Sequence, residues 1–193
     1  MPKYVKAFSL MDGREGTPAD EKRAFELAEE GNRAGCFHCQ GVLSICYKEA
    51  CGTPMDLEKA AQLAIASSRQ GSPYGDLALA SLKFNGLLGV VKNRREAFTL
   101  FKKAADAGID VGQFMLGVMY ENGEDVEQDY VEALRFFMLA ANQKYPSALF
   151  KVGDFHHGGF GVPRDISKAI PWYERAKAAG HLQAAMVLRF LPK

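Results

Sequence analysis

Apolar residues recur at every third or fourth position through most of the chain, in blocks that short glycine-containing segments separate. In residues 109–144, for example, a first apolar set ends at Tyr120 and a second runs from Tyr130 to Ala141. This spacing is typical of α-helices that bury one face. The pattern therefore predicts two helices in the block, an earlier helix A and a later helix B.

The helix pair is repeated along the chain. Successive alanine-rich segments of helix B end 40, 37, 36 and 36 residues apart, at Gly31, Gly71, Gly108, Lys144 and Gly180. A regular period of this length is typical of stacked helix-pair repeats, because one pair cannot bury its apolar face alone. We expect one domain, 1–193, made of a degraded first unit, four repeats and a closing helix: 4–31, 32–71, 72–108, 109–144, 145–180 and 181–190.

The segments between helix A and helix B end in a residue that can cap a helix: Asp56, Asn93, Asp129 and Asp165. Their side-chain oxygens can accept hydrogen bonds from the free N–H groups of helix B. Asn93 with Glu96, and Asp129 with Glu132, have the spacing of a capping box, in which the glutamate also bonds to the N–H of the cap.

Small residues recur inside helix A, at Gly41, Ala80, Gly117 and Gly153. At these positions we expect neighbouring helices to approach closely, with bulky side chains beside them. Pro171 falls inside the last predicted helix B, where its missing N–H predicts a kink or a later helix start.

Three sequence blocks carry a family resemblance: Leu116-Gly117-Val118-Met119-Tyr120, the glycine-rich segment 159–165, and Lys168-Ala169 with Trp172-Tyr173. They resemble the motif of the SEL-one-like repeat (SLR) family, a relative of the tetratricopeptide repeats. The resemblance implies an all-α fold, an α/α superhelix (solenoid) of helix-pair repeats. It is specific for residues 109–180, good for 72–108 and looser for 32–71.

The resemblance also implies a non-enzymatic scaffold that binds proteins or peptides along a concave surface formed by the A helices. Transferring the spacing between repeats predicts the lining residues of this groove: His38, Leu77, Ser81, Phe84, Phe114, Val118, Glu121, Phe150, Asp154 and His157. We expect about half of them to lie between helices instead, because a helix shows its core face with a similar period.

An alternative comes from cysteine-rich members of the family, which the resemblance links to penicillin binding and weak β-lactamase activity. In that subgroup the cysteines join the end of one helix B to the next helix A. Here the late helix B positions hold alanine or serine, so the defining feature of the subgroup is absent.

Four cysteines lie close together in the sequence, at Cys36, Cys39, Cys46 and Cys51. Cys36 and Cys39 form a C-x-x-C motif near the expected start of a helix, which leaves open a metal or redox site. Cys39 and Cys46 would be roughly 10 Å apart along one helix, too far to share a metal. The competing interpretation is reduced thiols that pack as small hydrophobic side chains.

Two adjacent histidines, His156 and His157, end the last helix A. Adjacent side chains on a helix point in different directions, so we expect His156 to replace the packing of Tyr120 and His157 to face solvent. A pH-sensitive or ligand-binding role remains the alternative, because histidine titrates near neutral pH.

Composition narrows the possible partners. The 24 Lys and Arg residues nearly balance the 23 Asp and Glu residues, and no long run of like charge occurs, which argues against nucleic acid or an acidic membrane as partner. No signal-peptide core, apolar run of about 18 residues or known catalytic or cofactor motif appears. We expect a cytoplasmic protein that binds a protein or peptide, with no cofactor, metal or catalytic residue.

Overall fold

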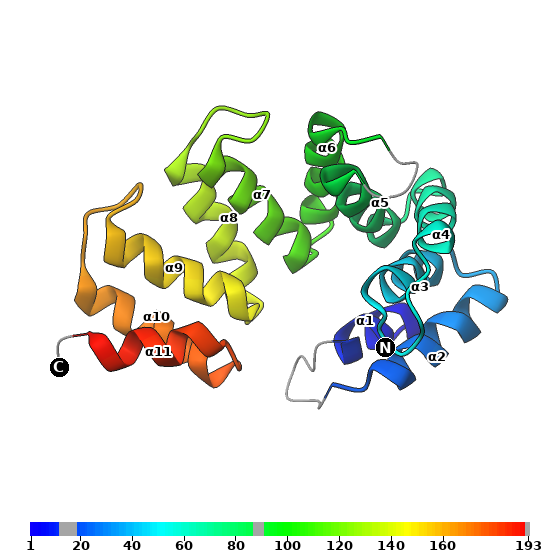
Figure 1. Cartoon of the computed structure of the whole chain (residues 1–193), viewed down its shortest axis with the longest axis horizontal. Coiled ribbons are helices and arrows are strands. Elements are labelled where there is room, and N and C mark those ends of the chain that lie inside the picture. The colour runs from blue at the N-terminus through cyan, green and yellow to red at the C-terminus, as the bar shows by residue number, and fades with distance from the viewer. Residues whose placement is uncertain (12–18, 87–90, 192–193) are drawn as a thin grey trace. The chain divides into compact units, whose positions relative to one another are not determined.

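The computed structural model describes residues 1–11, 19–86 and 91–191, and every regular element in these ranges is an α-helix (Figure 1). The helices form two compact units, Met1–Ala107 and Gly108–Lys193. The first contains α1 (Lys3–Met11), α2 (Glu21–Arg33), α3 (Phe37–Glu49), α4 (Leu57–Arg69), α5 (Pro73–Asn85) and α6 (Arg94–Asp106). The second contains α7 (Asp110–Asn122), α8 (Tyr130–Asn142), α9 (Pro146–Gly158), α10 (Ile166–Ala178) and α11 (Leu182–Phe190).

Within each unit, helices that follow one another in the sequence pack together. Helix A and helix B of one repeat are in contact, as in α3 with α4 and α9 with α10. A helix B also contacts the helix A that follows it in the same unit, as in α4 with α5 and α8 with α9. The predicted all-α class of stacked helix pairs is confirmed. The expected organisation as one domain, with the boundaries given above, stays a prediction.

The predicted caps of helix B are confirmed. Each cap side chain accepts a hydrogen bond from the backbone N–H three residues later, over 2.9 to 3.1 Å, at Asp56, Asn93, Asp129 and Asp165. A cap of this kind stabilises a helix by about 0.5–2 kcal/mol relative to alanine. These side chains therefore define where each helix B begins.

The second half of the predicted capping box is wrong. The N–H of Asp129 donates to the carbonyl of Tyr120, at 3.0 Å, and the N–H of Asn93 donates to the carbonyl of Lys83. The glutamate three residues on has other partners; Glu132, for example, pairs with Arg135. The N–H of the cap already has a partner at the end of helix A, so the cap ties helix B to helix A.

The expected close approach of helices is confirmed at two glycines. A Cβ atom added to Gly117 would lie 2.5 Å from Cε1 of Phe137, and one added to Gly153 would lie 2.7 Å from Cε1 of Tyr173. Both aromatic side chains are fully buried on the helix B of the same repeat. The missing side chain of each glycine makes room for a fully buried aromatic ring.

Pro171 lies inside α10, which begins at Ile166, directly after its cap. A later start of this helix, one of the two expected outcomes, is therefore wrong. The side chain of Asp165 already satisfies the N–H of Lys168, so the beginning of the helix is set before the proline is reached.

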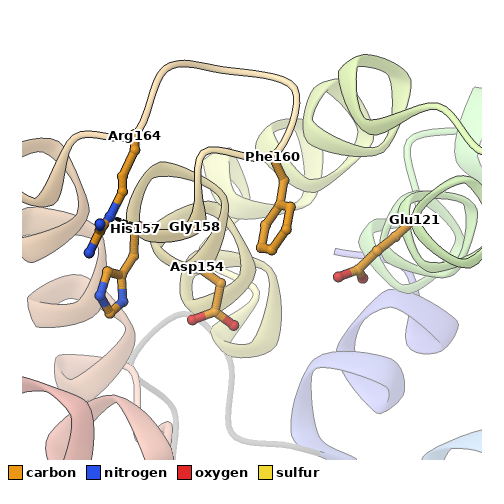
Figure 2. A pocket seen from close by; sticks show the side chains of 6 residues that line it. All are labelled: Glu121, Asp154, His157, Gly158, Phe160 and Arg164. Atoms are coloured by element: carbon orange, nitrogen blue, oxygen red, sulfur yellow. Dashed lines mark hydrogen bonds between the residues drawn. The ribbon is translucent and has the colours of Figure 1, made fainter.

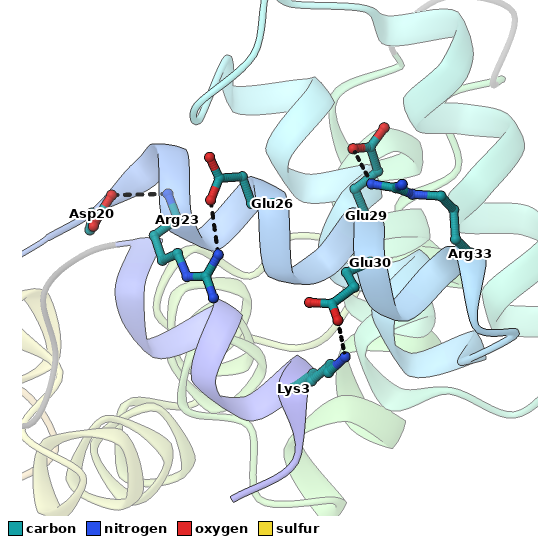
Figure 3. A network of polar contacts seen from close by, with 7 residues as sticks. All are labelled: Lys3, Asp20, Arg23, Glu26, Glu29, Glu30 and Arg33. Carbon is teal, nitrogen blue, oxygen red and sulfur yellow. Dashed lines mark hydrogen bonds and ion pairs between the residues drawn. The ribbon is translucent and has the colours of Figure 1, made fainter.

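The surface of the first unit carries ion pairs along α2 (Figure 3). Lys3 of α1 pairs with Glu30, while Arg23 pairs with Glu26 and Arg33 with Glu29 within the helix. All these side chains are well exposed, and ion pairs in water contribute little to stability. Among the described residues, no helix is long and apolar enough to cross a membrane.

Candidate binding pocket

An open pocket of about 440 Å³ lies on the second unit, between the C-terminal ends of α7 and α9 and the loop that follows α9 (Figure 2). Its lining consists of Glu121 from α7, Asp154, His157 and Gly158 from α9, and Phe160 and Arg164 from the loop. Three of these, Glu121, Asp154 and His157, were predicted as lining residues of the groove. The structure brings them together.

A buried hydroxyl connects two of the lining residues. The side chain of Tyr173, which is 0% exposed, donates its O–H to Oδ1 of Asp154 over 2.8 Å, and its oxygen lies 3.3 Å from Nδ1 of His157. A tyrosine has one proton to donate, so Nδ1 of His157 must carry the proton of its own bond to Tyr173.

Burial has the largest effect on the pKa values of Asp154 and Tyr173. It raises the pKa of Asp154, against the lowering effects of the bond from Tyr173 and the charge of Lys151. Burial, followed by the bond to Asp154, also raises the pKa of Tyr173, so its hydroxyl stays protonated. The hydroxyl therefore acts as a fixed donor that orients Asp154.

The preceding repeat shows why these polar residues occur together. Phe137 occupies the position of Tyr173 there, and Val118 occupies that of Asp154. Both rings are fully buried, but only Tyr173 brings a hydroxyl that needs a partner. The polar side chain at 154 is thus explained by the tyrosine on the neighbouring helix. The sequence signal that could have revealed it is the change from phenylalanine to tyrosine at this repeat position.

Glu121 forms the other end of the pocket. One of its carboxylate oxygens pairs with Nζ of Lys151 over 2.8 Å, and the two side chains are only 20% and 30% exposed. Lys151 was not among the predicted residues. It comes from the next helix A, so it both neutralises Glu121 and links α7 to α9.

Phe160 provides an apolar surface beside the charged groups. Its side chain is 43% exposed, and its ring packs on Tyr130 and Phe155 with centroid distances of 5.4 and 5.7 Å. A side chain at Gly158 would collide with this ring, so the glycine lets Phe160 fold back over the end of α9. Phe160 was not predicted, because its placement depends on the path of the loop.

Several predicted lining residues instead connect neighbouring repeats. Phe114 packs on Tyr145, with ring centroids 5.1 Å apart, and Phe150 stacks on His181 at 4.4 Å. In the first unit, Nδ1 of the half-buried His38 lies 3.1 Å from Oγ of Ser72. Each of these contacting residues directly precedes the next helix A and covers part of the surface that was predicted to line the groove.

The remaining predicted residues lie at different depths. Leu77 is 2% exposed and belongs to the core, so its prediction as a surface-lining residue is wrong. Ser81, Phe84 and Val118 are half-buried, Phe84 packs on Phe101, and Val118 packs against the core of the second unit. Their role in binding stays a prediction.

His157 faces solvent only in part: its side chain lines the open pocket, while Nδ1 of the ring contacts α10. Its side chain is half-buried and contacts the hydroxyl of Tyr173. The contact with the hydroxyl of Tyr173 holds the ring of His157 against α10, and helix periodicity alone does not show such a contact between helices. This contact, together with the pocket, gives weight to the alternative of a ligand-binding role for His157.

The four cysteines are free thiols. Sγ of Cys36 accepts a hydrogen bond from the N–H of Cys39 and caps α3, while Cys39, Cys46 and Cys51 are buried. Burial raises the pKa of Cys39 to about 12 and also raises that of Cys46, which keeps both protonated and weakly nucleophilic. Among the described residues, no three His, Cys, Asp or Glu side chains come together to hold a metal ion.

A family model described as the Sel1 repeat matches residues 7–36, 73–109, 111–145 and 146–181, which is more than half of the chain. The intervening stretch also folds as a helix pair, α3 and α4.

Two curated relatives have names that refer to other proteins. The chain is 27% identical to the "DAP3-binding cell death enhancer 1" of Rattus norvegicus, over 96% of this chain and 36% of that protein. It is 26% identical to the "ERAD-associated E3 ubiquitin-protein ligase component HRD3A" of Arabidopsis thaliana, over 61% of this chain and 18% of that protein. The chain thus spans well under half the length of these relatives.

Two solved structures share the fold. A Sel1 repeat protein from Oxalobacter formigenes aligns with a TM-score of 0.70 and 24% identity, over 94% of this chain and 74% of that one. The cysteine-rich protein B of Helicobacter pylori aligns with a TM-score of 0.54 and 26% identity, over 69% of this chain and 95% of that one. The predicted α/α solenoid fold is confirmed by the first likeness.

Proposed function

Because the chain belongs to the Sel1 repeat family, we propose that it is a non-enzymatic scaffold that holds a peptide segment of a partner protein against its A helices. The names of the two relatives support a role in protein assembly, one as a binder of DAP3 and the other as a component of a ubiquitin ligase. Both relatives are much longer than this chain, so their partners do not transfer with the resemblance.

The open pocket on the second unit is the observation that carries this proposal. It lies where equivalent positions of two A helices differ, with Glu121 on α7 and His157 on α9. Repeated residues maintain the stack, whereas residues that differ between repeats give one surface its own chemistry. A pocket with charged ends and an exposed aromatic ring suits an extended peptide with mixed side chains.

Site-specific photo-crosslinking would test the proposal. A photoreactive phenylalanine analogue at position 121 samples the pocket, and the same analogue at Val131, which is 63% exposed on helix B of the same repeat, serves as the matched control. In cells of the source organism we expect a discrete crosslinked protein at 121 and none at 131. Identical products at the two positions, or none at 121, would contradict the proposal that the A helices form a peptide-binding surface.

Penicillin-binding or β-lactamase activity is the competing function, because the resemblance links it to cysteine-rich members of the family and the chain shares its fold with the cysteine-rich protein B. The six lining residues of the pocket include no serine or cysteine, and the nearby hydroxyl of Tyr173 is buried and bonded to Asp154. We expect no hydrolysis of nitrocefin by the purified chain. Turnover that disappears in Asp154→Asn would instead establish an enzyme.

A further inference from the structure

Arg164 fulfils a structural task that another residue type fulfils in the preceding repeat. Its Nε–H donates to the backbone carbonyl of His157 over 3.1 Å. One repeat earlier, Nε2 of Gln128 donates to the carbonyl of Glu121 over 2.8 Å. The two donors and the two carbonyls occupy equivalent positions, so the repeat requires only one N–H from this side chain.

The two side chains differ in what remains after this bond. Gln128 also donates to the hydroxyl of Tyr130 at 3.1 Å, which uses both N–H groups of its amide. Arginine has five N–H donors, and Arg164 uses only the one on Nε. Among the described residues, Nη1 and Nη2 of Arg164 have no partner, although this side chain lines the pocket. Its charge and four donors exceed what the fold needs.

The surrounding charges show what these donors can bind. Arg164 and His157 lie at one end of the pocket and Glu121 at the other, with Phe160 and Asp154 between them (Figure 2). Glu121 is paired with Lys151, and Asp154 accepts the hydroxyl of Tyr173. Both carboxylates thus have protein partners, whereas Nη1 and Nη2 of the guanidinium have none among the described residues. Arg164 therefore brings to the lining a cation whose Nη1 and Nη2 groups are available to a carboxylate.

We propose that Arg164 is a specificity-determining residue that binds the carboxylate of an aspartate or glutamate in the partner peptide, beside an apolar side chain that rests on Phe160. A guanidinium binds a carboxylate through two parallel hydrogen bonds, which fixes the orientation of the peptide. The nearby carboxylates of Asp154 and Glu121 favour a singly charged carboxylate over a doubly charged phosphate. This inference rests on the proposed function and specifies the partner it takes.

The matched variant is Arg164→Gln, because the chain itself shows that glutamine makes the required bond to the carbonyl. We therefore expect R164Q to keep the melting temperature of the wild type while losing the charge in the pocket. Arg33→Gln removes an exposed positive charge from the first unit and serves as the control for a general charge effect.

The experiment is an NMR titration of the ¹⁵N-labelled full chain with two dipeptides, N-acetyl-Phe-Asp-amide and its isostere N-acetyl-Phe-Asn-amide. In the wild type and in R33Q we expect saturable shifts of the Arg164 Nε–H and of the amides of Asp154 and His157, with the aspartyl peptide binding about tenfold more tightly. In R164Q we expect the two peptides to bind equally weakly.

Equal binding of the two peptides by the wild type, no saturable shift with either, or preserved preference in R164Q would overturn the assignment of Arg164. This result is independent of the crosslinking at position 121. If a partner is crosslinked but the aspartyl peptide is not preferred, the scaffold function is supported and the proposed role of Arg164 is rejected. If the aspartyl peptide is preferred but no protein is crosslinked, the carboxylate-binding site is supported and the scaffold function is rejected.

Discussion

The hydrogen bond between Tyr173 and Asp154 should stabilise the second unit measurably, and the chain supplies its own apolar replacement. Tyr173→Phe removes the hydroxyl that donates to Oδ1 of Asp154 at 2.8 Å. A bond to a charged group contributes about 1.5–3 kcal/mol, and water reaches the half-buried Asp154 in part, so we expect Y173F to lose about 1–2 kcal/mol. Asp154→Val leaves the hydroxyl of Tyr173 buried without its acceptor, at a cost of about 1–3 kcal/mol.

The double variant Y173F/D154V reproduces the pair of the preceding repeat, where the buried Phe137 belongs to the same core as Val118. It leaves no polar group of the pair unsatisfied, so we expect its free energy of unfolding to lie within about 1 kcal/mol of the wild type. The two substitutions should therefore be strongly coupled, by about 2 kcal/mol in a double-mutant cycle.

Urea unfolding followed through the fluorescence of Trp172 is a suitable assay, because Trp172 is the chain's only tryptophan and lies in α10 beside the mutated position. Each kcal/mol lost corresponds to a decrease of about 2–4 °C in melting temperature for a chain of this size. Additive effects within about 0.5 kcal/mol, or a Y173F variant as stable as the wild type, would refute the reasoning that the hydroxyl determines the residue at 154.

Three further predictions concern the core, the carboxyl group and the thiols. Gly153→Ala should lower the free energy of unfolding in urea by about 1–3 kcal/mol, because the new Cβ would lie 2.7 Å from Tyr173; unchanged or higher stability would contradict the close approach. Asp154, whose folded pKa is raised above 3.8, gives stability that is present below that value and lost as pH rises through the folded pKa. The melting temperature of Asp154→Asn should therefore rise relative to the wild type between pH 3 and 7, and a constant difference would count against burial of the carboxyl. With a thiol reagent, the half-buried Cys36 should react before the fully buried Cys46, which should react only on unfolding, and a fast phase that survives in Cys36→Ser would contradict this order.

The local features of the fold could be predicted because short stretches of sequence determine them. A cap such as Asp129 acts on an N–H three residues away, and Gly153 makes room for a ring whose position follows from the repeat. The predicted capping box failed for a non-local reason, since the N–H of Asp129 bonds to the carbonyl of Tyr120 at the end of helix A.

The pocket was predicted only in part. Glu121, Asp154 and His157 could be found by asking where aligned repeats differ, but Phe160 and Arg164 belong to a loop whose path the periodicity does not describe. Phe114 and Phe150 were assigned to the groove because helix periodicity cannot show that Tyr145 and His181 cover them. Contacts across neighbouring repeats, rather than helix faces, decide which residues stay accessible.

The N–H of the residue that caps helix B bonds to a carbonyl of helix A, so the loop between the two helices can be exchanged while the helix ends stay joined. This hydrogen bond forms between Asp129 and Tyr120 and equally between Asn93 and Lys83, where the segment is one residue longer. Insertions or exchanged loop residues should thus leave the helix ends joined, because lengthening a closed loop costs little entropy. In evolution or in engineering, new recognition loops could be exchanged at this junction, with Phe160 and Arg164 as one example of what such a loop presents.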